Sequence, residues 1–161
     1  MALLSGFVEY GPAELMTVSE VVDEVRYGGL APERLMAAIE SGLVVVREAR
    51  PETVLKVLDA AAETGDRERL SKADIHLIAL ALEEHEKGSD VTIISDDYSI
   101  QNTASYMGLK VRGGVRPTIK KVVRWFSICV GCGYQSSSIV EKCPRCGGEM
   151  VRKSKTLDNQ L

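Results

Sequence analysis

The sequence has no apolar run near the ~18 residues that a membrane-spanning helix needs, so we expect no membrane partner. The first residues, Met1-Ala2-Leu3-Leu4-Ser5, include no basic side chain, which argues against a secretory signal. These two absences predict a cytoplasmic protein. Internal repeats and low-complexity tracts are also missing. With 161 residues, 45% of them hydrophobic and 27% charged, the chain is expected to form one globular domain of ordinary size and a small appendage.

Positive charge is scarce in the first two thirds of the chain. Residues 1–108 contain 9 Lys and Arg against 20 Asp and Glu, a net charge of −11, whereas residues 109–161 contain 11 against 3, a net charge of +8. A basic tail on an acidic body favours a polyanionic partner held by the tail, and RNA or DNA is the usual one. The alternative is that unlike charges merely segregate between two domains.

Cysteine is absent until residue 129, and the chain then has two C-x2-C pairs, formed by Cys129, Cys132, Cys143 and Cys146. In a chain with no sign of export, such pairs indicate a metal site before they indicate disulfides. Two C-x2-C turns supply the four thiolates of a tetrahedral zinc site, and a complete set leaves no open position for catalysis. Gly133 and Gly147 follow these pairs, where a tight turn needs an unhindered backbone. We therefore predict a structural zinc ribbon, with redox dithiols as the alternative.

Hydrophobic periodicity predicts an α/β fold with a mostly parallel sheet covered by helices on both faces, followed by the small β zinc ribbon. The predicted helices are residues 17–28, 32–41, 51–65, 71–87 and 98–107, and the predicted strands are residues 43–46, 91–94 and 109–111. The domains are expected at residues 1–112 (α/β domain), 113–124 (basic linker), 125–155 (ribbon) and 156–161 (tail).

Carboxylates that can converge on one edge of this sheet are Glu20, Glu24, Asp74, Asp96 and Asp97. Ligands bind beyond the carboxyl ends of parallel strands, and Asp96 and Asp97 follow a predicted strand directly. Converging carboxylates hold Mg²⁺ or Mn²⁺, which activates a water for attack on a phosphodiester and stabilises the leaving oxygen.

Helix capping is a structural alternative for most of these carboxylates. The capping pairs would be Thr17 with Glu20 and Ser71 with Asp74, and either Asp96 or Asp97 would cap the helix from Tyr98. Glu24 is the exception, because it lies past the first turn of its predicted helix, although a solvated helix face would also suit it.

Three motifs together point to a known family. They are Glu20-Val21-Val22-Asp23-Glu24-Val25, Leu70-Ser71-Lys72-Ala73-Asp74 and Ile94-Ser95-Asp96-Asp97-Tyr98-Ser99-Ile100-Gln101-Asn102. In this order and at these separations, they resemble the PIN family and most of all its NOB (Nin-one-binding) branch. That branch comprises the archaeal and eukaryotic endoribonucleases that mature the 3′ end of small-subunit rRNA. The resemblance covers essentially the whole chain and includes a zinc ribbon at this position.

The resemblance implies Glu24, Asp74 and Asp97 as the catalytic residues that hold Mn²⁺ or Mg²⁺. Asp96 is the second choice for the ligand position given to Asp97. It also implies structural Zn²⁺, pre-rRNA within a small-subunit precursor as the substrate, and assembly factors as protein partners. One departure concerns the start of the chain. The family begins with a strand that ends in a metal-binding Asp, and Met1 to Phe7 resemble the residues just after that Asp. We expect that the start was assigned too far downstream, and we expect poor cleavage by the chain without that carboxylate.

Basic residues in the linker and ribbon are the predicted RNA contacts: Lys120, Lys121, Arg124, Arg145, Arg152 and Lys153. Trp125, Phe126 and Tyr134 are candidates for stacking on bases, with packing of the ribbon against its neighbour as the alternative, which is favoured for Trp125. Two other functions remain open. One is an inactive RNA- or ribosome-binding module, and the other is a toxin-type PIN ribonuclease, although such toxins usually lack a zinc ribbon.

Overall fold

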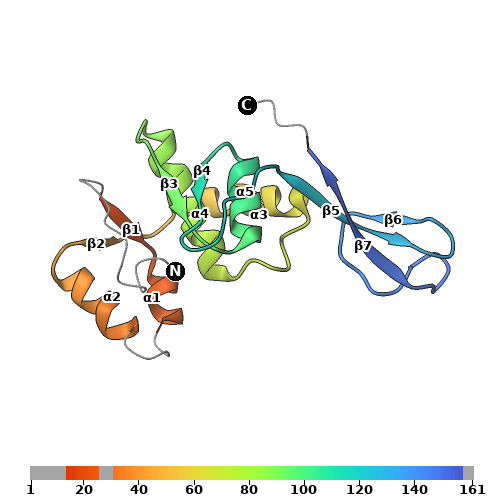
Figure 1. The fold of residues 1–161 in the computed structure, drawn as a ribbon, viewed down its shortest axis with the longest axis horizontal. Coiled ribbons are helices and arrows are strands. Elements are labelled where there is room, and N and C mark those ends of the chain that lie inside the picture. Colours follow the sequence, from red (N-terminus) through yellow and green to blue (C-terminus); the bar gives the residue numbers. More distant parts are fainter. Residues whose placement is uncertain (1–13, 26–30, 158–161) are drawn as a thin grey trace.

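The structure, a computed structural model, describes residues 14–25 and 31–157. In chain order the elements are β1 (Leu15–Thr17), α1 (Ser19–Glu24), α2 (Ala31–Glu40), β2 (Val44–Val46), α3 (Pro51–Thr64), α4 (Lys72–Glu86), β3 (Thr92–Ile94), α5 (Tyr98–Tyr106), β4 (Lys110–Arg112), β5 (Val123–Cys129), β6 (Gln135–Ser136) and β7 (Met150–Thr156). Figure 1 shows helices around short strands and, beyond them, a long β-ribbon formed by β5 and β7. Each described helix is too short or too polar to span a bilayer.

Parallel strand pairs flanked by helices confirm the predicted α/β class. β1 pairs with β2, with Leu15 opposite Val44, and β3 pairs with β4, with Thr92 opposite Lys110. Within the described residues, the strands form these two separate parallel pairs rather than one continuous sheet.

The start of the first helix was predicted wrongly. Thr17 is the last residue of β1, and α1 begins at Ser19 with Val18 as its N-cap and no side-chain cap. The capping box of Thr17 with Glu20 therefore does not form, because pairing of β1 with β2 extends the backbone at Thr17. The predicted end of this helix, residues 26–28, lies outside the described residues.

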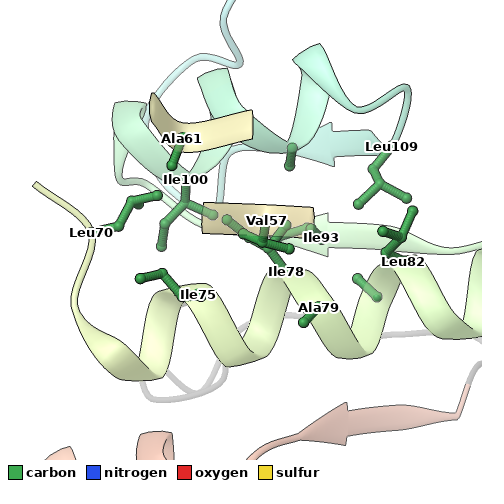
Figure 2. Packing of buried hydrophobic residues seen from close by; sticks show 12 residues of the cluster. Val57, Ala61, Leu70, Ile75, Ile78, Ala79, Leu82, Ile93, Ile100 and Leu109 are labelled. Atoms are coloured by element: carbon green, nitrogen blue, oxygen red, sulfur yellow. The ribbon is translucent and has the colours of Figure 1, made fainter. Parts of the chain in front are cut away.

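The core lies between α3, α4 and α5. Val57 on α3 and Ile78 on α4 are fully buried, and Figure 2 shows them meeting in the middle of the cluster, with Ile100 of α5 nearby. Small residues at Ala61 and Ala79 let the helices approach closely. Full burial of an aliphatic side chain stabilises a fold by about 1.5–3 kcal/mol. This cluster therefore fixes both α4 and α5, the helices whose first turns carry the candidate acidic residues.

Candidate functional site

Asp97 lies just after β3 and is the N-cap of α5. Its Oδ1 accepts hydrogen bonds from the backbone N–H groups of Ser99 at 2.6 Å and Ile100 at 3.4 Å, which confirms the capping prediction. No described residue donates a hydrogen bond to its Oδ2. Asp97 is exposed, so it has one oxygen engaged in the helix cap and one that a ligand could use.

Asp96 is used differently. Its carboxylate accepts hydrogen bonds from the backbone N–H groups of Gly114, Val115 and Arg116, at 2.9 to 3.1 Å. These donors, with Arg116 and Val115 foremost, lower the pKa of Asp96 and keep it ionised. The Asp96 carboxylate thus holds the backbone of the loop after β4 in place. Asp97 is the residue of the two that retains an oxygen for another role.

Asp74 forms the predicted capping box at the start of α4. Its Oδ2 accepts from the backbone N–H of Ser71 at 2.8 Å, and the Ser71 hydroxyl accepts from the backbone N–H of Asp74 at 3.2 Å. No described residue donates to Asp74 Oδ1. Capping and a ligand role are therefore compatible for Asp74, as they are for Asp97.

Glu24 is the last residue of α1, which packs against α4, and its side chain is exposed. Among the described residues, the carboxylates of Glu24, Asp74 and Asp97 do not gather within 4.8 Å of one another. These three residues alone thus do not form a complete set of metal ligands. The expectation of a further carboxylate before Met1, based on residues 1–7, lies outside the described residues.

A cluster of Glu20, Glu48 and His76, which sequence reasoning missed, joins α1 to α4. Their ligand atoms lie within 4.8 Å of one another, and His76 Nδ1 is 2.9 Å from Glu20 Oε1. Lys72 lies 3.1 Å from the same Glu20 oxygen. Burial raises the pKa of Glu20, but its own backbone N–H, Lys72 and His76 together lower it by more. The net effect is a lowered pKa. Since Lys72 already supplies a cation to Glu20, we interpret this cluster as a contact that joins α1 to α4. The sequence signal for this cluster was weak, since His76 belongs to no metal-binding motif.

An open depression of about 450 Å³ lies beside Asp97. It is lined by Arg69, Asp96, Asp97, Tyr98, Ser99 and Arg116. The depression brings together the turn before α4, the start of α5 and the loop after β4. A bound chain would therefore meet Asp97 from an open surface and not within an enclosed cavity.

The four cysteines converge in the β-ribbon. The Sγ atoms of Cys129 and Cys146 are 3.5 Å apart, and those of Cys132 and Cys143 are 3.6 Å apart. Four sulfurs at about 2.3 Å from one tetrahedral ion would be roughly 3.7 Å from one another. Gly133 and Gly147 both have φ of +72°, as expected for the tight turn after each pair. The arrangement therefore fits a zinc ribbon.

The thiol pKa values indicate how a cation would act on this cluster. Backbone N–H groups of Cys132 and Gly131 lower the pKa of Cys129 to about 6. The backbone N–H of Gly148 lowers the pKa of Cys146, but hydrogen bonds with the thiols of Cys132 and Cys129 outweigh it and raise this pKa to about 12. One thiolate thus opposes ionisation of its neighbours, and a metal ion is what allows all four to ionise.

Comparison with known proteins gives the family. Residues 7–83 match the family described as the PIN domain of ribonuclease. Endoribonuclease Nob1 of Archaeoglobus fulgidus is 39% identical over 91% of this chain and 84% of its own length. The chain belongs to the Nob1 family of PIN-domain endoribonucleases. Endoribonuclease Nob1 of Methanothermobacter thermautotrophicus is 36% identical over 94% of the chain and 88% of its own length. Ribonuclease VapC1 of Thermoplasma acidophilum is 35% identical over 94% of the chain and 74% of its own length.

Membership of the Nob1 family confirms the predicted enzyme class, an endoribonuclease, and implies an RNA substrate. The predicted RNA-binding residues of this family member fall into two groups. The exposed side chains that form no ion pair with a described residue are Lys120, Lys121, Arg145 and Lys153. Arg124 is 2.6 Å from Glu63, and the Arg152 guanidinium lies 3.8 Å from the centre of the Trp125 ring. Trp125 thus packs on Arg152 within the ribbon, and its backbone also lies close to Gly65 at the end of α3, as expected for packing of the ribbon against its neighbour.

The Gln101-Asn102 pair of the Nob1-like motif joins α5 to the backbone that leads into β5. Asn102 Nδ2 donates to the Val123 carbonyl at 2.8 Å, and the Val123 N–H donates to Asn102 Oδ1 at 2.9 Å. Gln101 Nε2 donates to the Ser95 carbonyl at 2.7 Å, while its Oε1 accepts from the Ile119 N–H at 2.8 Å. Both side chains are buried. The sequence singled out this pair only through the resemblance.

Proposed function

We propose that this chain is a metal-dependent endoribonuclease that cleaves pre-rRNA to generate the 3′ end of small-subunit rRNA during ribosome biogenesis. The observation that carries the proposal is Asp97, whose exposed carboxylate follows β3 beside an open depression in a member of the Nob1 family. In this proposal, residues 1–112 are the nuclease domain, and Glu24, Asp74 and Asp97 hold Mg²⁺ or Mn²⁺. The bound ion would supply the activated water.

The ribbon has a separate task in this proposal. Zn²⁺ on the four cysteines fixes residues 125–155, and the basic linker of residues 113–124 connects them to the nuclease domain. RNA is held by Lys120, Lys121, Arg124, Arg145, Arg152 and Lys153. We place this work in the cytoplasm, on a small-subunit precursor that also carries assembly factors. The net charge of +8 in residues 109–161 supports this division, because the acidic body repels RNA.

Cleavage of a precursor RNA tests the proposal. A form of the protein that carries the family's first strand and its metal-binding Asp ahead of Met1, incubated with an RNA that spans the 3′ end of small-subunit rRNA and with Mn²⁺ or Mg²⁺, is expected to cut at one position, whereas the 161-residue chain is expected to cleave poorly. Asp97→Asn and Asp74→Asn are each expected to reduce the rate by about 100-fold or more, because an amide supplies no negative charge to the ion. The rate is measured from labelled RNA resolved on a gel.

Capping provides the control for these substitutions. Asn is a competent N-cap, so Asp97→Asn should leave the melting temperature nearly unchanged. A rate unaffected by both Asn variants would mean that these residues only cap helices, and the proposed site would then be wrong.

An RNA-binding module without catalysis is the second candidate. It is favoured by the separation of Glu24, Asp74 and Asp97 in the described residues. Tight binding of the precursor RNA together with no metal-dependent cleavage by the form that carries the first strand and its Asp would support this candidate over the first.

A further inference from the structure

The depression beside Asp97 contains three side chains that neither the capping interactions nor the proposed metal site uses. They are Arg69, Tyr98 and Arg116, and each is exposed. They come from the turn before α4, the first residue of α5 and the loop after β4. The fold thus places two cations and one aromatic ring around the candidate catalytic carboxylate.

Arg69 is an exposed cation within residues 1–108, the acidic part of the chain. Five other cations there, Arg47, Arg50, Lys56, Lys72 and Lys87, each form an ion pair with a glutamate. Arg69 forms no ion pair with any described residue. Burial and the charge of Arg69 together lower the pKa of Arg152, so Arg69 also lies within electrostatic reach of the ribbon. Its charge is therefore available to an anion at the surface between the depression and the ribbon.

Arg116, which also lines the depression, belongs to the loop that the Asp96 carboxylate holds. Three successive backbone N–H groups, those of Gly114, Val115 and Arg116, donate to the Asp96 carboxylate. These bonds fix the backbone of Arg116, while its guanidinium forms no ion pair with a described residue. A fixed backbone lowers the entropy cost of using this side chain to bind a ligand.

Tyr98 supplies an aromatic surface next to Asp97. Its side chain is 53% exposed although it begins a helix whose following residues, Ser99 and Ile100, are buried. An aromatic ring at a water-accessible surface, flanked by cations, is the arrangement on which proteins stack an unpaired base.

We propose that Arg69, Tyr98 and Arg116 form a subsite for single-stranded RNA at the cleavage position. The two arginines contact backbone phosphates beside Asp97, and Tyr98 stacks on the base of an adjacent nucleotide. A base inside a duplex cannot reach the ring, so the subsite selects an unpaired strand. This inference rests on the proposed nuclease function, and it identifies the strand path from the candidate carboxylate toward the ribbon.

Binding of a fluorescently labelled single-stranded RNA to the full-length protein, without added Mg²⁺ or Mn²⁺, tests the subsite. Arg69→Ala and Arg116→Ala are each expected to weaken binding about 3-fold or more and to lower the salt slope by about 0.7. Tyr98→Ala is expected to weaken binding by about 5-fold or more, while Tyr98→Phe keeps the ring and should bind like the unmodified protein.

Arg67→Ala is the matched control, since Arg67 is exposed, lies two residues from Arg69 and is not part of the depression. It removes the same charge and should leave binding unchanged. Equal losses for Arg67→Ala and Arg69→Ala would overturn the subsite in favour of diffuse electrostatic attraction. Equal losses on single-stranded and double-stranded RNA would overturn the role of Tyr98.

Photo-crosslinking provides a readout independent of affinity. RNA carrying 4-thiouridine is expected to crosslink to Tyr98, and mass spectrometry of the digested protein identifies the residue. Crosslinks confined to the ribbon would contradict the proposal. If the Arg and Tyr variants bind and cleave normally while Asp97→Asn is inactive, the subsite is wrong and the nuclease function stands. If the variants lose binding but no form of the protein cleaves RNA, the subsite holds and the nuclease function fails.

Discussion

Asp66 is a buried carboxylate close to Asn102 of α5 and Arg152 of β7, with 1% of its surface exposed. Asn102 Nδ2 donates to its Oδ2 at 2.6 Å, and the nearest cation, Arg152, is 3.9 Å from its Oδ1. Burial raises the pKa of Asp66, and the hydrogen bond from Asn102 and the charge of Arg152 offset only part of this effect. The ionised form is therefore less favourable in the folded protein than in the unfolded chain.

Replacement of Asp66 by Asn tests this reasoning through pH dependence. Since the folded-state pKa is raised, the unmodified protein gains stability as the pH falls through that pKa toward the unfolded value near 3.8. Asp66→Asn lacks this titration. The free energy of unfolding of the unmodified protein, relative to the variant, should therefore increase as the pH falls from 7 to 4. Urea unfolding at several pH values measures the difference, and a difference independent of pH would contradict it.

At the scale of elements, α5 connects the candidate site to the ribbon. Its first turn is capped by Asp97, and its second turn carries Asn102, which pairs with the backbone of Val123 at the start of β5. On the other side of this junction, Gly65 ends α3 with φ of +72°, and a Cβ there would lie 2.4 Å from the Trp125 carbonyl oxygen. Close backbone packing and one amide side chain thus set the direction in which β5 leaves the nuclease domain.

Asn102→Ala is expected to loosen this junction. The substitution removes the side-chain partner of the Val123 N–H and of the Val123 carbonyl, and one of the hydrogen bonds to the Asp66 carboxylate, at a cost of about 1–3 kcal/mol. Amide hydrogen exchange at Val123 should become faster, while exchange in the middle of α4 stays slow. Ser105→Ala is the control, because Ser105 is on the same helix and its side chain makes no hydrogen bond with a described residue. Unchanged protection at Val123 would show that packing alone holds β5.

At the scale of the whole molecule, two stabilising mechanisms act in different parts of the chain. The helical domain has an apolar cluster that includes Val57, Ile78 and Ile100. The ribbon has few buried apolar side chains, and its small cluster is built from Cys129, Cys143 and Met150. A module of this size needs metal binding to offset its chain entropy.

Metal removal should therefore affect the two parts unequally. The purified protein is expected to contain one zinc per chain. A strong chelator should abolish the dispersed NMR amide signals of β6 and of the two C-x2-C turns. The helical signal in circular dichroism should be retained. Atomic absorption and NMR measure the two effects. Loss of the helices together with the ribbon would mean that the two parts fold as one unit.

The charge division gives a prediction about RNA affinity. Lys120→Ala with Lys121→Ala should weaken binding to many RNA sequences alike and lower the salt slope by about 0.7 for each phosphate that the protein no longer neutralises. Arg124 offers a comparison, since its ion pair with Glu63 already neutralises part of its charge and its removal should have a smaller effect. Filter binding at several salt concentrations measures the slopes. Full affinity in the double variant would mean that the charges segregate without binding RNA.

Local signals in the sequence suffice for much of this protein. Pro51 and Gly65 bound α3, and the Ser71–Asp74 capping box starts α4, because these residues act through bonds to neighbours in the chain. The cysteine spacing likewise predicts the cluster, since each C-x2-C turn is a local structure. The same signals named Asp74 and Asp97 as helix caps.

Contacts between distant segments required the tertiary structure. Thr17 extends β1 because Val46, 29 residues later, lies beside it, and this pairing overrides the local capping signal. The contact of Glu20 with His76, the bonds of Asn102 to Val123 and the packing of Arg152 on Trp125 all join residues far apart in sequence. Likewise, Arg69, Tyr98 and Arg116 have no common motif, and only the packing of three separate segments places them around Asp97. Local spacing specifies turns and caps, whereas these side-chain contacts depend on how the helices pack.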